Sequence, residues 1–353
     1  MDKKLLIEVL KKEIEKSTGC TDPGAVTLAV AKATEVLGEK PERIKVAVSS
    51  NVYKNGISVG VPGTGQRGLR QAAALGIYLS EWTGEDLGLL DHVNNEIVRA
   101  SQDLLKEGGV KVSYLKETPD RLYIKAEVFK GDNTAWTVIQ GDYSNITETG
   151  KNGHTLFNKP VKKTENGVDA LIRFKIADII ETIKHLDLEE LEFLIEDAKV
   201  NKAAAEEGMN NENAVMGSAL SSMIKDAPFP YSAMMLGKLY TASAAEARMI
   251  GLNVPIMAIA GSGNHGITNF LGVLAAAEIL KVSETELARA LAISSAITVF
   301  IKGYIKRMTA FCGCSVAAAT GVAAATVYML GGSFEDMVNA MHSVLGALAG
   351  IVC

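Results

Sequence analysis

The sequence has few cysteines and few aromatic residues for its length. Four cysteines stand among 353 residues, which is too few for a disulfide framework. In a reducing compartment, closely placed cysteines are better explained as metal ligands or reactive thiols. Aromatic residues make up 6% of the chain although 48% of it is hydrophobic. The apolar content is therefore carried by Ala, Val, Ile, Leu and Met, and this composition favours tightly packed helices.

The sequence also lacks an excess of positive charge and an apolar leader. Its formal net charge is −5, and no run of Lys and Arg is dense enough to form a basic stripe. Nucleic acid is therefore excluded as a general partner. Residues 1–18 alternate charged residues with Leu and Ile and contain no uncharged apolar core of the kind that a signal peptide needs. We therefore expect a cytoplasmic location.

One apolar stretch is long enough to raise the question of a membrane span. Residues 308–330 are apolar and rich in glycine, and about 20 such residues can cross a bilayer. Alanine contributes little to insertion, however, and four hydroxyl residues dilute the stretch: Thr309, Ser315, Thr320 and Thr326. We expect a helix buried on all sides of a helical bundle, and no membrane partner.

The pattern along the chain predicts two domains of an α+β protein. We expect helices from Asp2 to Ser17 and from Asp22-Pro23 to about residue 38. Strands are expected over 43–53 and 56–63, then helices over 65–82 and 85–108, then strands over 110–117, 121–130 and 134–143. A polar linker follows over 151–167, and everything after it is expected to be helical. Residues 39–165 thus form a compact, smaller α+β unit.

A glycine-rich loop precedes one of the expected late helices. Residues 261–266, Gly-Ser-Gly-Asn-His-Gly, lie between an apolar run and a helix expected to start near Thr268. Such a loop directs free amide hydrogens at one spot, so that Ser262, Gly263, Asn264 and His265 could hold a carboxylate or phosphate. The alternative is a plain helix-entry turn, in which His265 is structural. The spacing matches neither a Walker loop nor a dinucleotide fingerprint.

A second polar loop follows the first expected strand. It carries Asn51, Lys54 and Asn55, and then Pro62-Gly63-Thr64. The Lys-Asn-Gly sequence is compatible with a simple hairpin turn. A second glycine-rich loop so close behind it favours contact with a ligand instead.

The cysteines are unevenly placed. Cys20 directly precedes a helix start, where the helix dipole is expected to lower the pKa of a thiol and make it reactive. Cys312 and Cys314 form Cys-Gly-Cys in an Ala-rich stretch, and Cys353 is the last residue. An isolated Cys-x-Cys is usually a pair of small buried hydrophobes. Composition alone goes no further.

Four motifs, read in order, resemble those of a known family. They are CTDP from Cys20, NVYKNG from Asn51 with VPGT after it, GSGNHG from Gly261, and IKGYIKRMTAFCG ending at Gly313. Together they resemble the L-cysteine desulfidase family, which is related to the alpha part of iron-sulfur L-serine dehydratase, and the match spans essentially the whole chain. The resemblance implies a mostly helical, discontinuous catalytic domain of residues 1–38 and 166–353 with the α+β domain of 39–165 inserted.

The resemblance also implies roles for individual residues. A 4Fe-4S cluster is held by three cysteines, with one iron open to substrate; Cys312 matches the first ligand and Cys353 the second. Cys20 matches the thiol that acts as catalytic base. The remaining motif residues are expected to bind the amino-acid substrate: Thr21, Asp22, Asn51, Lys54, Asn55, Gly63, Thr64, Ser262, Gly263, Asn264, His265 and Lys302.

The third cluster ligand has no match in this sequence. In the family it follows the position of Cys353, where this sequence stops. A truncated chain, a natural remnant, or replacement by Cys314 or Cys20 are the open alternatives. Because Cys314 is two residues from Cys312 on an expected helix, we expect the two side chains to point in different directions and not to share one cluster.

The implied activity is conversion of L-cysteine to pyruvate, ammonia and sulfide. Three alternatives stay open: L-serine as the substrate on the same scaffold, a cluster-free chain that binds a small carboxylate, and a chain that serves as a subunit. A pyridoxal phosphate lyase is disfavoured because GSGNHG has no lysine partner at the expected setting. The Ala-rich apolar helices suggest a homodimer.

Overall fold

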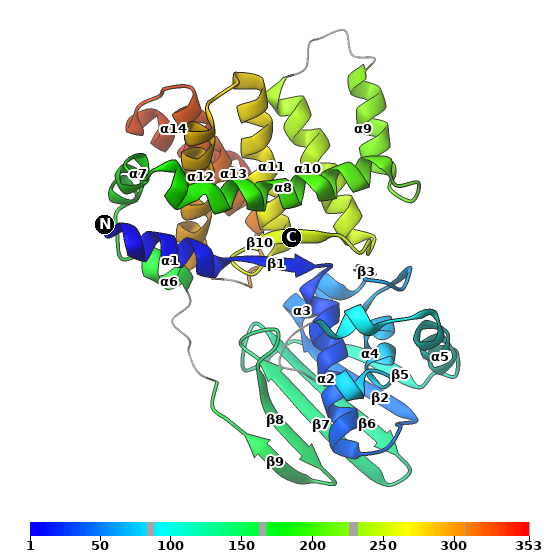
Figure 1. The fold of residues 1–353 in the computed structure, drawn as a ribbon. Helices are drawn as coiled ribbons and strands as arrows, with labels where there is room; N and C mark the ends of the chain where they lie inside the picture. Colours follow the sequence, from blue (N-terminus) through cyan, green and yellow to red (C-terminus); the bar gives the residue numbers. More distant parts are fainter. Residues whose placement is uncertain (83–87, 162–166, 226–231, 307, 353) are drawn as a thin grey trace. The chain divides into compact units, whose positions relative to one another are not determined.

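The computed structural model describes residues 1–82, 88–161, 167–225, 232–306 and 308–352 (Figure 1). The predicted cluster ligand Cys353 lies outside these residues. Contacts between Cα atoms divide the chain into two compact units. The helical unit consists of residues 1–17, 165–247 and 254–353, and the sheet unit of residues 18–164 and 248–253. The predicted α+β class is confirmed.

The sheet unit is built on six strands in the order β5-β2-β6-β7-β8-β9. Strands β2 and β5 are parallel, and the other neighbours are antiparallel. In β2 and β6, alternate residues are buried, as expected for a sheet with one covered face. The strands are β2 (Arg43–Ser49), β5 (Val110–Leu115), β6 (Tyr123–Lys130), β7 (Asn133–Gln140), β8 (Ile146–Lys151) and β9 (His154–Asn158).

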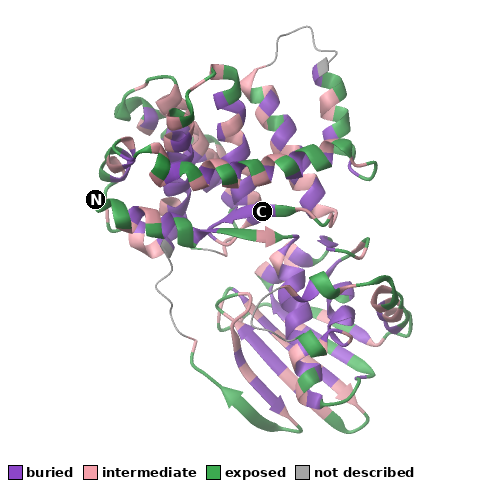
Figure 2. Ribbon diagram, viewed as in Figure 1, coloured by how far each residue is buried: buried purple, intermediate pink, exposed green. Residues whose placement is uncertain are grey.

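Helix α2 (Thr21–Leu37) covers one face of this sheet. It packs on β6 and β7 and on helix α4 (Leu69–Gly76), and almost its whole length is buried (Figure 2). The approach of α4 is close, because a Cβ on Gly76 would lie 2.6 Å from Cβ of Val30. The rest of the unit consists of α3 (Ser50–Gly56), the hairpin β3 (Gly60–Val61) with β4 (Gln66–Arg67), η1 (Ser80–Trp82), η2 (Gly88–His92) and α5 (Asn95–Lys106). The packing of α2 on the sheet and on α4 therefore determines where the N-terminus of α2 lies within the unit.

The helical unit surrounds helix α12 (Glu284–Ile305). A capping box between Ser283 and Glu286 starts α12, and it packs on α8, α11 and α13. Its buried residues form one core with those of its neighbours. The other elements are α1 (Lys3–Glu13), β1 (Ile14–Thr18), α6 (Gly167–Leu171), α7 (Ile176–Lys184), α8 (Leu188–Asn210), α9 (Val215–Lys225), α10 (Ala233–Met249), β10 (Pro255–Ile259), α11 (Gly263–Leu280), η3 (Cys314–Ala318), α13 (Ala319–Met329) and α14 (Phe334–Leu348).

Helix α12 is also the one element in the described residues that is long and apolar enough to cross a membrane. Of its most apolar window, 72% is buried inside the protein, as in the core helix of a bundle. The stretch 308–330, expected to be one buried helix, is divided. It holds the π-helix η3 followed by α13, and several of its residues are only partly buried.

Two local predictions near the N-terminus were wrong, one because of strand pairing and one because of a helix cap. The helix expected to reach Ser17 ends at Glu13, because residues 14–18 form β1 and pair with β10. The hairpin expected at Lys54-Asn55-Gly56 is helix α3, started by Ser49, whose hydroxyl accepts from the amide of Val52.

Strands were also missed where polar residues suggested a linker. Residues 146–158 form β8 and β9 at the edge of the sheet, and every residue of β9 is exposed, so that it has no apolar alternation to detect. Strand β10 was likewise expected to be part of an all-helical region.

The units differ from the expected domain boundaries at two places. Residues 18–38 group with the sheet, because α2 packs on β6, β7 and α4. Residues 248–253 also belong to the sheet unit, where the backbone of Ile250 and Gly251 lies so close to Gly60 that a Cβ there would come within 2.4 Å of both.

A buried asparagine ties β10 to α8. The side chain of Asn201 donates to the carbonyl of Met257 at 3.2 Å and accepts from the amide of Met257 at 2.7 Å. Asn201 is fully buried. It thereby provides hydrogen-bond partners for both backbone groups of Met257 in β10, the strand that leads into the GSGNHG loop.

We expect Asn201→Ala to lower the free energy of unfolding by about 3 kcal/mol, because both backbone groups of Met257 lose their buried partner. The measurement is the midpoint of urea unfolding followed by circular dichroism. Asn210→Ala, at the exposed end of the same helix, is the control and should change the free energy by less than about 0.5 kcal/mol. Equal midpoints for the two variants would contradict this role.

Candidate functional site

Cys20 lies at the start of α2 in the sheet unit. It is the N-cap residue, its side chain makes no capping hydrogen bond, and it is 6% exposed. The preceding Gly19 has a φ of +67°, and a Cβ there would lie 2.1 Å from Cγ of Pro62. Only glycine fits this turn. The close approach brings the CTDP motif against the VPGT motif, as one site would require.

Asp22 is the centre of the polar contacts around Cys20. The Cys20 thiol donates to Oδ2 of Asp22 at 3.5 Å, and the Tyr143 hydroxyl donates to Oδ1 at 3.4 Å. The side chain of Asn55 also hydrogen-bonds this carboxyl group. Asp22 is 3% exposed. A carboxylate closed off from water is thus held by several uncharged donors.

Arg248 supplies the positive charge of this cluster. It is 4% exposed, and its Nε donates to the carbonyl of Gly19 at 3.1 Å. Its charge acts to lower the pKa of both Asp22 and Cys20. Arg248 begins the segment 248–253, which belongs to the sheet unit although it is more than 200 residues from Gly19 in the sequence.

Burial dominates the protonation of both acidic groups. It raises the pKa of the Asp22 carboxyl to about 6, against the opposing effects of its donors and of Arg248. Burial, reinforced by the charge of Asp22, raises the pKa of the Cys20 thiol to about 12. The expectation of a lowered thiol pKa was therefore wrong, because desolvation outweighs the helix dipole. At neutral pH, Cys20 is a thiol.

The other predicted residues of the sheet unit fall into two groups. Asn55 reaches Asp22, and its Oδ1 accepts from the Lys54 ammonium at 2.8 Å, so that Lys54 also belongs to this cluster. Asn51 instead donates to the carbonyl of Arg121 at 3.5 Å. Thr64 closes the β3–β4 turn by donating to the carbonyl of Val61 at 2.7 Å.

Two further predicted residues flank this cluster in sequence. Thr21 is the first residue of α2, and Gly63, with a φ of +73°, forms the exposed turn before Thr64.

In the helical unit, a strained turn joins β10 to α11. Ala260 and Gly261 both have positive φ, of 50° and 76°, and left-handed backbone is costly at alanine. Helix α11 begins at Gly263, earlier than the start expected near Thr268, so that Asn264 and His265 lie in its first turn. A Cβ on Gly266 would lie 1.8 Å from the carbonyl oxygen of Met257. Glycine therefore lets the helix N-terminus sit tightly against β10.

His265 connects this loop to the Cys-Gly-Cys segment. Its Nδ1 lies 3.2 Å from the carbonyl of Ile259, so this nitrogen carries the hydrogen when the ring is neutral. Its Nε2 faces Gly313, where a Cβ would come within 2.0 Å of it. His265 is 5% exposed. Two motifs that are about 50 residues apart thus meet in one place.

Cys312 is held as a thiolate. Hydrogen bonds from Cys314 and then from Ser315 lower its pKa to about 4, although burial opposes the shift. The side chain of Cys314 therefore points at Cys312, and the expectation that the two diverge was wrong. The physical reason is that Cys312 lies before the helix, and Cys314 begins a π-helix and not a regular α-helix.

The chain end pairs alongside Cys312. The amide of Cys312 donates to the carbonyl of Ile351 at 2.9 Å, and Phe311 forms a β-bridge with Val352. The residues immediately before Cys353 therefore lie beside Cys312.

A stabilised thiolate is the form in which cysteine binds iron. Cys312 thus fits a cluster ligand. The described residues contain no group of three His, Cys, Asp or Glu side chains that could hold a metal, so that they do not complete the site by themselves.

Lys302 lies within α12 and is fully buried. A buried ammonium is costly unless it is paired, and such a lysine is more often functional or tied into a network than accidental.

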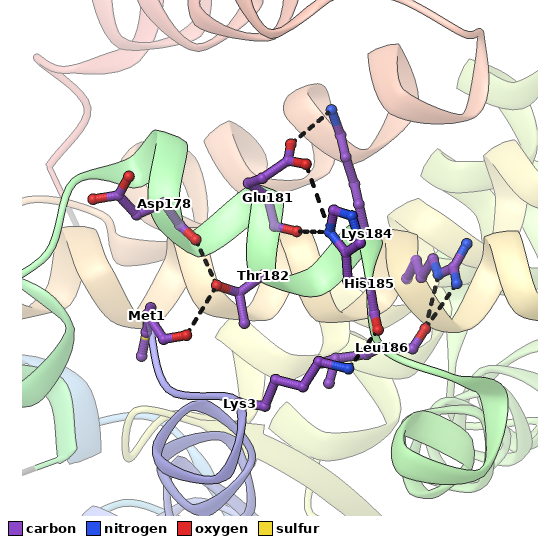
Figure 3. Close-up of polar contacts among 9 residues, drawn as sticks. Met1, Lys3, Asp178, Glu181, Thr182, Lys184, His185 and Leu186 are labelled. Carbon is purple, nitrogen blue, oxygen red and sulfur yellow. Dashed lines mark hydrogen bonds and ion pairs between the residues drawn. The ribbon is translucent and has the colours of Figure 1, made fainter.

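A surface pocket of about 310 Å³ lies elsewhere in the helical unit (Figure 3). The backbone carbonyl of Met1 accepts from Thr182 at 3.4 Å, and that of His185 accepts from Lys3 at 2.6 Å. No predicted site residue lines it; its lining is Met1, Lys3, Asp178, Glu181, Thr182 and His185. It therefore does not compete with the two clusters as a candidate active site.

Comparison with known proteins identifies the family. The family model described as serine dehydratase alpha chain matches residues 89–353. This chain belongs to the serine dehydratase alpha chain family. A protein of Methanocella arvoryzae named UPF0597 protein is 48% identical over all of this chain and 83% of its own length.

More distant members share the same extent. UPF0597 proteins of Alkaliphilus oremlandii and Clostridium tetani are each 34% identical over 99% of this chain and 82% of their own lengths. No solved structure matches. The family model begins at residue 89, so it covers His265 and Cys312 but only Tyr143 and Arg248 of the cluster around Asp22. The relatives cover 99% or more of the chain.

Two members of the sheet-unit cluster were missed from the sequence. Tyr143 ends an expected strand, and Arg248 stands in the last turn of an Ala-rich helix, where a cation is unremarkable. No local pattern distinguishes either from a surface residue. Only the tertiary structure shows that these two side chains lie beside Asp22.

We expect Cys312 in metal-free protein to be alkylated by iodoacetamide at pH 6, where an ordinary thiol scarcely reacts, with a midpoint near pH 4. Ser315→Ala removes a hydroxyl donor to the thiolate and should move this midpoint to higher pH. Mass spectrometry of the peptide measures the rate. Ser343→Ala, an exposed position, is the control. A midpoint near pH 9 in the unaltered protein would refute the assignment.

Proposed function

We propose that this member of the serine dehydratase alpha chain family is an iron-sulfur lyase that converts L-cysteine to pyruvate, ammonia and sulfide. The observation that carries the proposal is the thiolate of Cys312, stabilised by its neighbours and contacted through Gly313 by the first turn of α11. The order of the four motifs and the family match support it.

The chemistry has two difficulties, which call for two kinds of group. The α-hydrogen of an amino acid is weakly acidic, and sulfide leaves poorly while it carries its full charge. When bound, a 4Fe-4S cluster with one open iron supplies a Lewis acid for the leaving atom. Cys312 and Cys353 would hold it, and the third ligand is not assigned.

The chain's own residues bind the substrate and move the proton. The first turn of α11, which begins at Gly263, suits the substrate carboxylate, because a helix N-terminus favours an anion. His265 presents Nε2 towards Gly313 and can accept a hydrogen from a bound group. Cys20 is the proposed proton-removing group, and Asn55 with Lys54 adds polar contacts near it.

L-Serine is the second candidate substrate, and the family description favours it. The reaction is the same elimination, with hydroxide in place of hydrosulfide as the leaving group. A cytoplasmic location and a homodimer are further parts of the proposal.

Protein purified without oxygen should contain iron and acid-labile sulfide and should release sulfide and pyruvate in equal amounts from L-cysteine. Pyruvate without sulfide, formed from L-serine only, would assign the dehydratase activity. Cys312→Ala should lower the iron content, because it removes a ligand. Protein that contains no iron and turns over neither amino acid would reject the proposed function.

Cys20→Ala should abolish turnover while the brown chromophore of the cluster is unchanged, because Cys20 handles the proton and not the metal. The measurement pairs steady-state turnover with the visible absorption spectrum. Unchanged turnover would remove Cys20 from the mechanism, whereas a lost chromophore would make it a ligand.

A further inference from the structure

The contacts of Cys20 raise a problem for its role as a base. A buried thiol that donates to a carboxylate already carries a proton. It can take a second one only if the first leaves at the same time. This thiol donates its hydrogen bond to Oδ2 of Asp22, at 3.5 Å.

We propose that Asp22 is the final proton acceptor of the site, which takes the thiol proton of Cys20 as Cys20 takes the α-proton of the substrate. This inference rests on the proposed function and adds a catalytic residue to it. Asp22 belongs to the sheet unit, as do Cys20, Asn55, Tyr143 and Arg248.

The step balances. The Cα–H bond breaks, and its electron pair forms the double bond to Cβ as the bond from Cβ to the leaving heteroatom breaks with its pair. The α-proton forms a new S–H bond on Cys20, while the original thiol proton forms an O–H bond on Asp22. Cys20 is unchanged at the end, and Asp22 is a neutral carboxylic acid. No oxidant or reductant is needed.

The surroundings of Asp22 suit a transient proton acceptor. Asp22 is 3% exposed, and its carboxylate is held by three neutral donors of the sheet unit: the Cys20 thiol, the Asn55 amide and the Tyr143 hydroxyl. Arg248 supplies the only positive charge among the groups that affect its pKa. Burial favours the protonated carboxyl and raises its pKa, whereas the hydrogen-bond donors stabilise the ionised carboxylate.

The pKa of Asp22, about 6, suits a group that accepts and then releases a proton in each turnover at neutral pH. At neutral pH the resting carboxylate is ionised and can accept, and the acid formed in turnover returns its proton to water. Since burial raises this pKa above that of an exposed aspartate, activity should be lost as pH falls through about 6. Cys20, Tyr143 and Arg248 are the titratable or charged groups facing Asp22. Burial raises the pKa of Cys20 to about 12 and the pKa of Tyr143 well above its usual value, so that neither of these two groups ionises near pH 6.

Tyr143 is then a positioning residue. Its hydroxyl donates to Oδ1 and leaves Oδ2 to the thiol. Tyr143→Phe removes a donor to the ionised carboxylate, so that the pKa of Asp22 should rise and the acid limb of turnover should move to higher pH. A purely structural role for Tyr143 would lower turnover at all pH values equally.

The test combines turnover with infrared spectroscopy of the full chain. Asp22→Asn keeps the shape but cannot accept a proton, and it should lower kcat by at least about 100-fold. Asp142→Asn, exposed and next to Tyr143 in sequence, is the matched control and should retain turnover. Turnover of Asp22→Asn within a few fold of the unaltered protein would overturn the relay while leaving the proposed function intact.

The spectroscopic arm does not depend on turnover. The S–H stretch of Cys20, assigned by its loss in Cys20→Ser, should shift to a more strongly hydrogen-bonded position as pH rises through about 6, and Asp22→Asn should abolish this step. A Cys20 band without such a step, or a step that persists in Asp22→Asn, would overturn the pairing. A step that depends on Asp22 in protein that turns over neither amino acid supports the proton-sharing pair and rejects only the proposed function.

Discussion

The exclusion of water from the start of α2 is the constraint on which the chemistry of the sheet unit depends. Helix α2 is apolar along most of its length and is buried by the sheet and by α4. Its first turn therefore carries Asp22 into the interior with it. Burial of a carboxylate has to be offset by donors, and Tyr143, Asn55 and Cys20 provide them. The packing of one helix thus determines the protonation of two acidic groups.

Thiols on the two units are controlled in opposite ways. Burial and a neighbouring carboxylate keep Cys20 protonated, whereas donors from Cys314 and Ser315 keep Cys312 ionised. A protonated thiol suits proton transfer, and a thiolate suits metal binding. The difference in environment agrees with the difference in proposed role.

Glycines permit the close contacts that bring the motifs together. Gly19 admits Pro62, Gly266 admits the carbonyl of Met257, and Gly313 admits the ring of His265, each at a distance that no Cβ would allow. Gly76 serves the packing of α4 on α2 in the same way. The motifs are therefore rich in glycine for steric reasons within each unit, besides any contact that they make with a ligand.

The sequence by itself determined the α+β class, most of the helices, the strands β5, β6 and β7, and the family, because these follow from periodicity and from motifs in a fixed order. It could not determine β1, β9 or α3, whose state depends on the partner they pair with or on a cap. Nor could it show that Cys20 is a buried thiol or that Tyr143 and Arg248 face Asp22. Protonation is set by desolvation and by groups far apart in the chain, and only the tertiary structure brings those together.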